Sequence, residues 1–450
     1  MKRWLVSFAF TLVACGQGNL VDSQHRDIRS LSSVASDDGA IDPLAVPTLS
    51  SASPASMAMG GPDFVLTVNG SGFIKQSVLR LNGEDRDTQF VSSGQLRANI
   101  TASDIATPGL RSLTVFNPGE DGGESSAVYF AVFISQVSND IIYDPVGGLI
   151  WASVPSIVGG NGVISIDPYT GERSPLVFVG SEPAKLAISN DGRSLFVGLD
   201  GAAAVRQFDI PSRTAGIFFP VGRDSFLGLM FVEDMQVLPG SSDSVAISRR
   251  LEPFISPRHA GVAIYDSGVM RPTQTPGHTG SNVIQFSNSP ERLYGYSNEG
   301  DGGFRRMLVD DSGVTTLDSA GGLLAGGRNF RFDRYDERIY STGGRVVDPE
   351  QRILLGTFPN VSSGSLVAPD SATGRTFYLT GVDHTLWVFD PNTFTPLGQS
   401  QIPGVSGTVA SLIRWGDEGL AFLGGSNQIF ILTSPVPAMP ATGRRMVSWR

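Results

Sequence analysis

The sequence predicts an all-β protein in which a small β-sandwich precedes a larger β-propeller of seven blades. The chain has 450 residues and 54 glycines, where average usage gives about 30, and this excess indicates many tight turns. Its apolar runs are short and are separated by turn residues, as expected of strands. In the C-terminal part, a strand–turn pattern recurs about every 43 residues, which is the period of four-stranded propeller blades.

Residues 1–14 carry the features of a secretory signal peptide. Lys2 and Arg3 supply the positive charge, and the apolar segment 4–13 follows directly. This segment is too short to span a bilayer, which requires about 20 apolar residues. We therefore expect it to be removed on export.

The end of this segment reads Leu12-Val13-Ala14-Cys15, which resembles the lipobox of bacterial lipoproteins. The resemblance implies cleavage between Ala14 and Cys15 and a diacylglyceryl group on the Cys15 thiol. Through this lipid, the membrane would be a partner of the protein. Gly16 follows the cysteine in place of aspartate, which by the same resemblance implies an outer-membrane lipoprotein, on either the surface or the periplasmic face. An ordinary signal peptide with an incidental cysteine is the alternative.

Cys15 is also the sole cysteine of the chain, so no intrachain disulfide stabilises the exported domains. Residues 15–45 are rich in Ser, Asp and Gly and have no sustained period, which predicts a flexible tether. His25 belongs to this predicted tether, and we expect it to be a solvated residue.

Residues 46–133 predict a β-sandwich, because seven short strands are expected in fewer than 90 residues. Asn82-Gly83 is the strongest hairpin-turn dipeptide in this segment. The expected strands lie at 46–53, 64–68, 77–81, 88–91, 96–100, 111–116 and 127–133.

This segment resembles the IPT/TIG family of immunoglobulin-like domains. The resemblance rests on Ser53-Pro54, 66–73, 77–83, the run Leu96/Ala98/Ile100, Pro108-Gly109 and Asn117-Pro118-Gly119. It implies an immunoglobulin-like β-sandwich that acts as a spacer between the membrane and the next domain. A direct binding role is the alternative.

Residues 134–434 predict the propeller, and 435–450 form a C-terminal tail. Seven copies of the repeat lie at 141–172, 184–214, 235–270, 282–314, 329–355, 365–397 and 411–434. The last copy lacks a final strand, which residues 129–136 could supply to close the ring.

Two kinds of turn recur in these copies. Asn190-Asp191-Gly192 predicts the turn after an inner strand, and Asp167-Pro168, Asp348-Pro349 and Asp390-Pro391 predict β-turns between outer strands. Segments 166–171 and 187–197 resemble the seven-bladed propellers of the YVTN and lactonase-like superfamily. Six or eight blades remain alternatives.

No catalytic residue, cofactor or metal site is predicted, and the ligand-binding residues are unknown. The glycine-rich runs lack the Lys-Ser/Thr of a phosphate loop, and no nucleophile elbow is present. The histidines, His25, His259, His278 and His384, form no metal-binding pair and are expected in loops or on blade surfaces.

Three segments are candidate binding loops. The acidic loops 120–124 and 298–303 have oxygen ligands of the kind that calcium prefers, but solvated turns are the favoured interpretation. The long segment 254–280 is either an ordinary loop or part of a ligand-binding face. A site built from residues scattered around the central channel would leave no local motif.

The net charge of −10, or −12 after removal of Lys2 and Arg3, argues against nucleic acid as a partner. The leading hypothesis is a non-enzymatic, lipid-anchored binding or scaffold protein of the cell envelope, with a protein or carbohydrate ligand. A lactonase-like propeller hydrolase or a carbohydrate-active envelope protein is one alternative. A purely structural envelope protein is another.

Replacing Cys15 by serine tests the anchor, because only a thiol accepts the lipid. We expect the wild type and the control Ser23→Ala to sediment with membranes and to incorporate radiolabelled palmitate, and Cys15→Ser to do neither. Equal labelling of Cys15→Ser and the wild type would contradict the lipid anchor.

Overall fold

The computed structural model describes residues 46–252, 255–278, 280–417, 419–425 and 427–433. The predicted signal peptide, the cleavage and lipidation site at Ala14 and Cys15, the tether up to residue 45 and the tail 435–450 lie outside the described residues. The described chain consists of strands and three short 3-10 helices, η1 (Ala102–Ile105), η2 (Ser156–Val158) and η3 (Ser371–Thr373), so the all-β prediction is confirmed. Among these residues, no helix has the length and apolar character needed to cross a bilayer.

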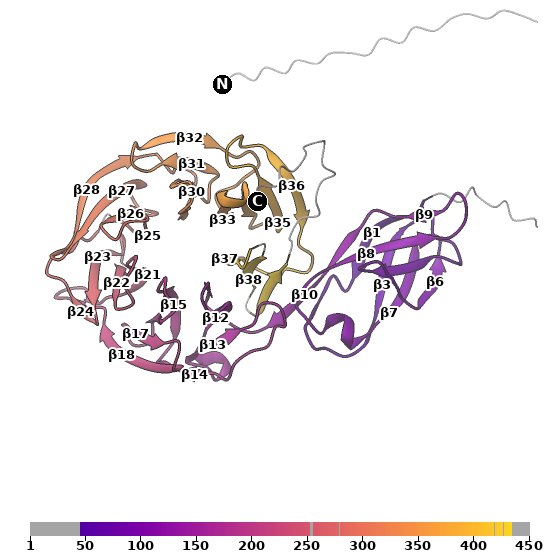
Figure 1. Cartoon of the computed structure of the whole chain (residues 1–450), viewed down its shortest axis with the longest axis horizontal. Helices are drawn as coiled ribbons and strands as arrows, with labels where there is room; N and C mark the ends of the chain where they lie inside the picture. The colour runs from indigo at the N-terminus through magenta and orange to yellow at the C-terminus, as the bar shows by residue number, and fades with distance from the viewer. Residues whose placement is uncertain (1–45, 253–254, 279, 418, 426, 434–450) are drawn as a thin grey trace, which may run out of the picture. The chain divides into compact units, whose positions relative to one another are not determined.

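The N-terminal part contains two sheets that share one hydrophobic core. The order of the first sheet is β1-β3-β7-β6, and the second contains β10-β8-β4-β5, with β2 beside β10 and β9 beside β8 (Figure 1). The strands are β1 (Thr48–Ser53), β2 (Ser56–Ala58), β3 (Phe64–Ser71), β4 (Val78–Leu81), β5 (Glu84–Asp85), β6 (Thr88–Ser92), β7 (Gln95–Ile100), β8 (Gly109–Asn117), β9 (Gly123–Glu124) and β10 (Val128–Ser135).

Alternation along the strands explains this core. In β7, Leu96, Ala98 and Ile100 are buried while the residues between them are exposed, because successive side chains of a strand point to opposite faces. Asn82 and Gly83 join β4 to β5 with φ angles of 52° and 83°. Positive φ at both central residues defines a type I′ turn, as the Asn-Gly dipeptide predicted.

Groups of antiparallel strands follow in a ring (Figure 1). Within the described residues, six groups are four-stranded sheets, here called blades 1 to 6. Blade 1 contains β11 (Asp140–Asp144), β12 (Leu149–Val154), β13 (Gly162–Ile166) and β14 (Val177–Phe178). Blade 2 contains β15 (Pro183–Ile188), β16 (Ser194–Leu199), β17 (Ala204–Asp209) and β18 (Thr214–Pro220), and the hairpin β19 (Arg223–Asp224) and β20 (Gly228–Leu229) follows it.

The next four blades repeat this order. Blade 3 contains β21 (Phe231–Val237), β22 (Ser244–Arg250), β23 (His259–Asp266) and β24 (Val269–Met270). Blade 4 contains β25 (Val283–Phe286), β26 (Arg292–Tyr296), β27 (Gly303–Asp310) and β28 (Gly313–Gly321). Blade 5 contains β29 (Phe330–Phe332), β30 (Ile339–Ser341), β31 (Arg345–Asp348) and β32 (Ile353–Thr357). Blade 6 contains β33 (Leu366–Asp370), β34 (Arg375–Leu379), β35 (Thr385–Phe389) and β36 (Pro396–Gln401).

The last group, blade 7, is completed by a strand from the N-terminal part. It contains β37 (Ala410–Trp415), β38 (Gly419–Gly424) and β39 (Gln428–Leu432). Ile134 and Ser135 of β10 pair with Ile429 and Gln428 of β39, as expected from the missing final strand. Residues Val128 to Val132 of the same strand pair with β8, so β10 belongs both to the N-terminal sheets and to the ring.

Hydrophobic clusters fill the spaces between neighbouring blades. Trp151 of blade 1 packs with Leu186 and Phe208 of blade 2, and Ile134 of β10 packs with residues of blades 7 and 1. Corresponding clusters join each of the other neighbouring pairs around the ring. This arrangement confirms the predicted β-propeller, in which each blade buries its two faces against its neighbours.

The predicted turns are also observed. The Asp167 carboxylate accepts hydrogen bonds from the backbone N–H groups of Tyr169 (2.8 Å) and Thr170 (3.1 Å) between β13 and β14. Asp348 and Asp390 cap the corresponding turns of blades 5 and 6 in the same way. Short polar side chains that bond the backbone two or three residues ahead favour this turn.

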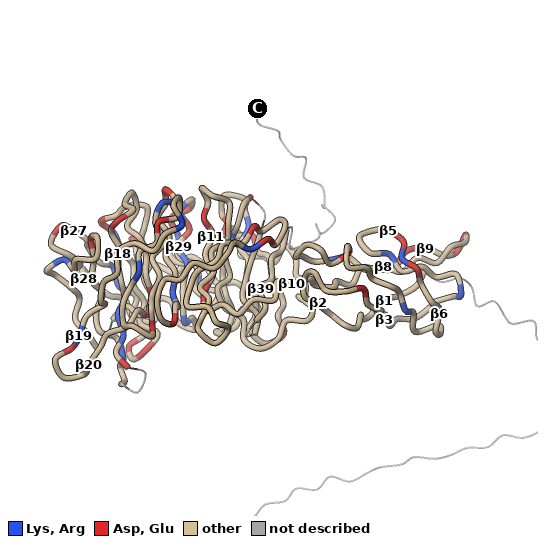
Figure 2. The backbone as a smooth tube through the Cα atoms, turned by 90° about the horizontal axis from the view of Figure 1, so that it is seen from below, with Lys and Arg blue, Asp and Glu red and all other residues tan. Residues whose placement is uncertain are grey.

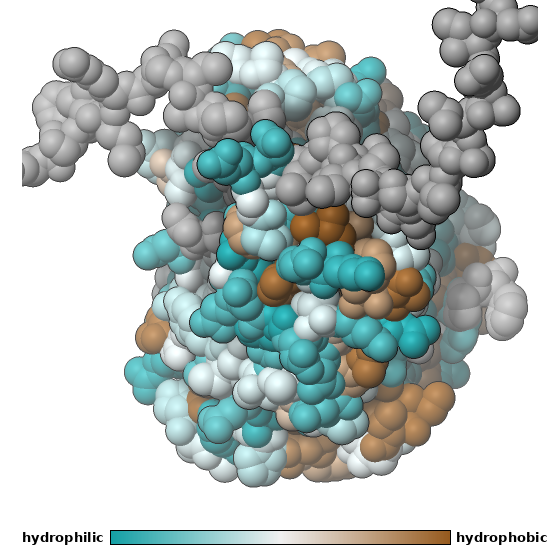
Figure 3. Space-filling view, turned by 90° about the vertical axis from the view of Figure 1, so that its right-hand side faces the viewer, coloured by the Kyte–Doolittle hydropathy of each residue, from teal (hydrophilic) through white to brown (hydrophobic). Residues whose placement is uncertain are grey.

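The molecular surface has no single dominant character. Figure 2 shows positive and negative residues interspersed along the chain. The face seen in Figure 3 is mostly hydrophilic or intermediate, with apolar residues in small separate groups. Scattered exposed apolar residues are normal for folded proteins, so this face suggests no specific partner.

Ile134 tests the dependence of the ring on its closing strand. This side chain is 1% exposed between blades 7 and 1, so we expect Ile134→Ala to lower the free energy of unfolding by about 2–5 kcal/mol in urea titrations. The control is Ile157→Ala, whose side chain is 83% exposed and should change stability by less than about 0.5 kcal/mol. If the two variants lost similar amounts of free energy of unfolding, the closing strand would contribute little to stability.

Candidate functional site

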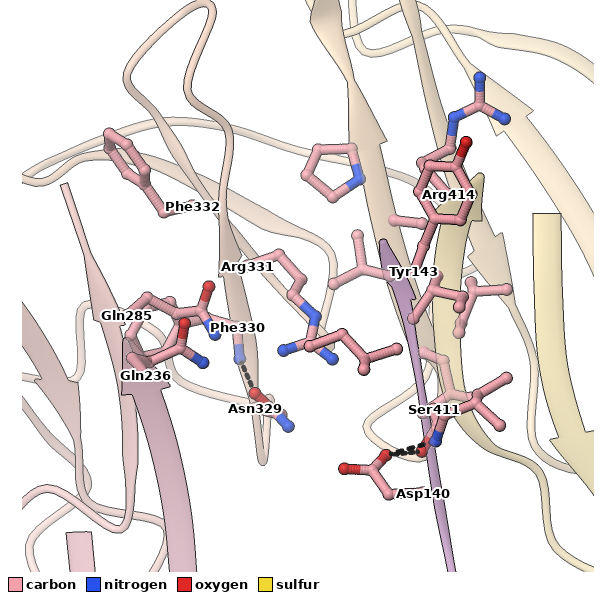
Figure 4. Close-up of a pocket in the computed structure, with 18 of the residues that line it drawn as sticks. Asp140, Tyr143, Gln236, Gln285, Asn329, Phe330, Arg331, Phe332, Ser411 and Arg414 are labelled. Atoms are coloured by element: carbon pink, nitrogen blue, oxygen red, sulfur yellow. Dashed lines mark hydrogen bonds between the residues drawn. The ribbon is translucent and has the colours of Figure 1, made fainter. Parts of the chain in front are cut away.

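The inner strands of the ring enclose a cavity of about 500 Å³ (Figure 4). Its lining comes from the first strands of blades 1 to 7, which are β11, β15, β21, β25, β29, β33 and β37, and from adjoining residues. A central concave site of this volume is a typical place for a small-molecule ligand.

One residue in each first strand is buried against the preceding blade and so defines an equivalent position around the ring. These residues are Ile141, Leu186, Met235, Ile284, Phe330, Val367 and Leu412. The residues immediately before and after each of them point to the opposite face of the strand. The residues that come immediately before these seven form one set, here called the preceding tier. The residues that come immediately after them form a second set, the following tier, and members of both sets line the cavity.

Carboxylates of the preceding tier join neighbouring blades. Asp140 accepts a hydrogen bond from the backbone N–H of Leu186 in blade 2 (3.1 Å) and another from the Ser411 hydroxyl in blade 7 (2.6 Å). Asp234 of blade 3 accepts one from the backbone N–H of Ile284 in blade 4 (2.9 Å). These bonds satisfy backbone donors that would otherwise be unpaired at the ends of the inner strands.

Lys185 lies in the preceding tier between these two aspartates. Its side chain lines the central cavity and also a second cavity of about 460 Å³, so its exposed surface faces the interior of the ring. The Asp140 carboxylate raises the pKa of Lys185 against the opposing effect of burial, and Asp234 adds to the increase. The ammonium group is therefore charged, although it makes no hydrogen bond or close ion pair with the described residues.

For Asp234, burial is the largest effect on the pKa. The loss of solvent around this carboxyl raises its pKa to about 6, and the charge of Lys185 limits the increase. Burial disfavours the charged form of an acid, so Asp234 takes up a proton more readily than an exposed aspartate.

The following tier contributes polar side chains from three consecutive blades. They are Gln236 of β21, Gln285 of β25 and Arg331 of β29, and within the described residues their side chains make no hydrogen bond or close ion pair. Figure 4 shows Arg331 projecting into the space between the two glutamines on one side and Ser411 on the other. Two amides and one guanidinium are therefore available to a ligand.

A second charged cluster lines the neighbouring cavity, but its groups are paired. Arg250 contacts Asp200 (3.0 Å), and Arg258 contacts Glu233 (2.6 Å) and, at 3.6 Å, Glu299. Burial raises the pKa of Asp200 against the effect of Arg250. Because these ion pairs satisfy one another, the cluster is better explained as a link between blades than as a binding site.

The segment 254–280 differs from the expected loop. Its residues His259 to Asp266 form β23, the third strand of blade 3, and Tyr265 packs in the core between blades 2 and 3. The expectation that His259 lies in a loop or on a blade surface was wrong: it is 1% exposed, and burial lowers its pKa to about 4. The predicted repeat at 235–270 contains this strand, but the sequence did not indicate that it begins at His259.

The other segments that the sequence singled out hold no assembled site. In 298–303, Asp301 pairs with Arg305 (2.6 Å), and in 120–124, Glu124 accepts a hydrogen bond from Thr114 (2.5 Å). The Nε2 atom of His384 lies 3.2 Å from the Gly407 carbonyl oxygen. The backbone of His278 forms an isolated antiparallel β-bridge with the backbone of His259. Within the described residues, no group of three or more His, Cys, Asp or Glu side chains is placed to hold a metal ion.

Comparisons with known proteins support the fold alone. No family model matches this chain, and no match to a curated protein was found. The β-propeller domain of Cps50 (Swd1) from Myceliophteria thermophila is 14% identical with a TM-score of 0.53, over 66% of this chain and 97% of that one. Hydrazine synthase from Kuenenia stuttgartiensis is 14% identical with a TM-score of 0.50, over 67% of this chain and 97% of that one. This chain is therefore a β-propeller protein with a polar cavity at the centre of its ring.

Titration of Asp234 gives a test of this geometry. Because its pKa is raised in the folded state, its contribution to stability is present below about pH 4 and is lost as the pH rises through about 6. Asp234→Asn cannot titrate, so we expect the stability of the wild type relative to this variant to fall between pH 4 and pH 7 in urea titrations.

Asp209→Asn is the matched control. Hydrogen bonds from Ser212 lower the pKa of Asp209, so its contribution to stability is complete above about pH 5 and the difference from the wild type should be constant from pH 5 to pH 7. A constant difference for Asp234→Asn as well would show that Asp234 is solvated.

Proposed function

We propose that this chain is a lipid-anchored protein of the bacterial cell envelope that binds a small polar ligand in the channel of its propeller. In this proposal, Cys15 carries the lipid, the N-terminal sheets form an immunoglobulin-like IPT/TIG spacer, and the ring of seven blades is a lactonase-like propeller without catalytic activity.

The observation that carries the binding role is the set of available polar groups in the cavity. Gln236, Gln285 and Arg331 come from neighbouring inner strands and line one enclosed space without partners among the described residues. These side chains are half-buried and open to the cavity, so their N–H and C=O groups can bond to a ligand there.

The channel carboxylates favour binding over hydrolysis. A general base needs a free carboxylate within reach of a water molecule or substrate. Asp140 and Asp234 instead accept backbone hydrogen bonds from the next blade, and Asp140 also accepts one from Ser411. Their positions are explained by the joining of blades.

The anchor and the spacer are supported by the sequence and by the strand order. The segment Leu12 to Cys15 supports lipidation. Mainly antiparallel strands in two sheets over a common core support the immunoglobulin-like assignment. Because β10 belongs to both the N-terminal sheets and blade 7, the spacer is joined to the ring by a continuous strand rather than by a free linker.

Blocking the cavity tests the binding role. Gln285→Trp places a large side chain in the cavity, and Gln351→Trp places the same side chain on an exposed turn of blade 5. In thermal-shift measurements with a library of sugars, peptides and organic acids, we expect some compounds to stabilise the wild type and Gln351→Trp but not Gln285→Trp. A library that stabilises none of the proteins, or all three alike, would contradict a binding site in the channel.

A further inference from the structure

The following tier of the inner strands divides the cavity into a polar side and an apolar side. Blades 3, 4 and 5 contribute Gln236, Gln285 and Arg331. At the equivalent positions, blades 6, 7 and 1 contribute Ala368, Ile413 and Ile142. Polar and apolar residues are therefore contiguous around the ring rather than mixed, and a ligand spanning the cavity meets both.

The polar side favours an anion over a cation. Arg331 presents a planar set of N–H donors, and no described residue supplies it with a hydrogen-bond acceptor. The carboxylates that would attract a cation, Asp140 and Asp234, already accept backbone hydrogen bonds and lie on either side of the Lys185 ammonium. Arg331, like Arg334 in the same lining, has no hydrogen-bond acceptor among the described residues.

A carboxylate is the anion that best fits these groups. A guanidinium binds a carboxylate through two parallel hydrogen bonds, and the neighbouring glutamine amides can donate to the same oxygens. A phosphate or sulfate carries more charge and is usually bound by several cations or by a helix N-terminus. Here the charge of Lys185 is offset by Asp140 and Asp234, and Arg331 is the guanidinium that shares a tier with the two glutamines.

The apolar side requires that the anion carry an apolar group. Ile142, Ala368 and Ile413 offer only hydrocarbon surface, and Leu366 of blade 6 extends it. Burial of an apolar group against this wall contributes roughly 25 cal/mol for each Å² removed from water. The cavity of about 500 Å³ has room for a small organic acid with an aryl or short acyl group.

We propose that the channel selects amphipathic organic carboxylates, with the carboxylate bound by Arg331, Gln236 and Gln285 and the apolar group packed against Ile142, Ala368 and Ile413. This proposal rests on the channel being the binding site, and it specifies the class of ligand.

Isothermal titration of the mature protein with three probes tests it. 3-Phenylpropionate has both a carboxylate and an apolar group, 3-phenylpropionamide lacks the charge, and acetate lacks the apolar group. We expect 3-phenylpropionate to bind at least about tenfold more tightly than either of the others, because a hydrogen-bonded charge contributes that factor or more. Equal affinity for the amide, or stronger binding of acetate, would overturn the proposal.

Variants then test the role of each side of the cavity in binding. Arg331→Gln should weaken 3-phenylpropionate about tenfold to a hundredfold and leave the amide unchanged. Ile413→Ser should weaken the acid and the amide alike. The control Arg352→Gln removes an arginine from an exposed turn and should change neither. Thermal melting of each variant distinguishes loss of binding from loss of fold, and unchanged affinity in a folded Arg331→Gln protein would refute the role of Arg331.

The outcome also separates this proposal from the broader one. If 3-phenylpropionate fails to bind but another library compound is excluded by Gln285→Trp, the channel is a binding site and its assignment to carboxylates is wrong. If no compound is excluded by Gln285→Trp, both proposals are wrong.

Discussion

Burial of apolar surface between neighbouring blades is the interaction on which the rest of this structure depends. A blade of four strands has two apolar faces and cannot cover either of them by itself, so each is stable only between two others. The clusters around Trp151, Tyr340 and Phe430 are of this kind, since each takes residues from two blades or from the two strands that close the ring. Such a ring requires closure, and closure comes from β10, which pairs with β39 at one end and with β8 at the other. The chain therefore joins its N-terminal sheets to its propeller by the same strand that completes the ring.

The geometry of the cavity follows from this packing. Each first strand is fixed by one residue buried against the preceding blade, as Met235 and Phe330 are, and the residues beside it lie on its opposite face, where Gln236 and Arg331 line the channel. Asp140 and Asp234 add hydrogen bonds between adjacent inner strands, which fixes the spacing of the strands around the cavity. Gln236, Gln285 and Arg331 consequently project from a rigid frame, so a ligand would meet preorganised groups and lose little free energy in ordering them.

Much of this fold could be predicted from the sequence because its determinants are local. The dipeptide Asn82-Gly83 and the turn aspartates act within two or three residues, and the recurring pattern gives the repeat. The cavity could not be predicted in this way, because its residues are far apart in the sequence, as Asp140 and Ser411 are at a separation of 271 positions. A signal was nevertheless present: Gln236, Gln285 and Arg331 each stand between two apolar residues in the first strand of a repeat. Alignment of the copies by their buried residue would have placed them at one level of the channel. His259 was misassigned because β23 begins at this residue, two positions before the apolar run 261–265 that indicated a strand.

The central claim is that the channel, and not the outer surface, is the functional part of the propeller. A crystal structure of the protein purified from the envelope in which it is made tests this claim most directly. The account predicts electron density for a bound molecule in the cavity, within hydrogen-bonding distance of the Arg331 guanidinium and in contact with the side of the cavity that carries Ile413. Density for ordered water alone in the cavity, together with a ligand bound on the outer strands, would contradict it.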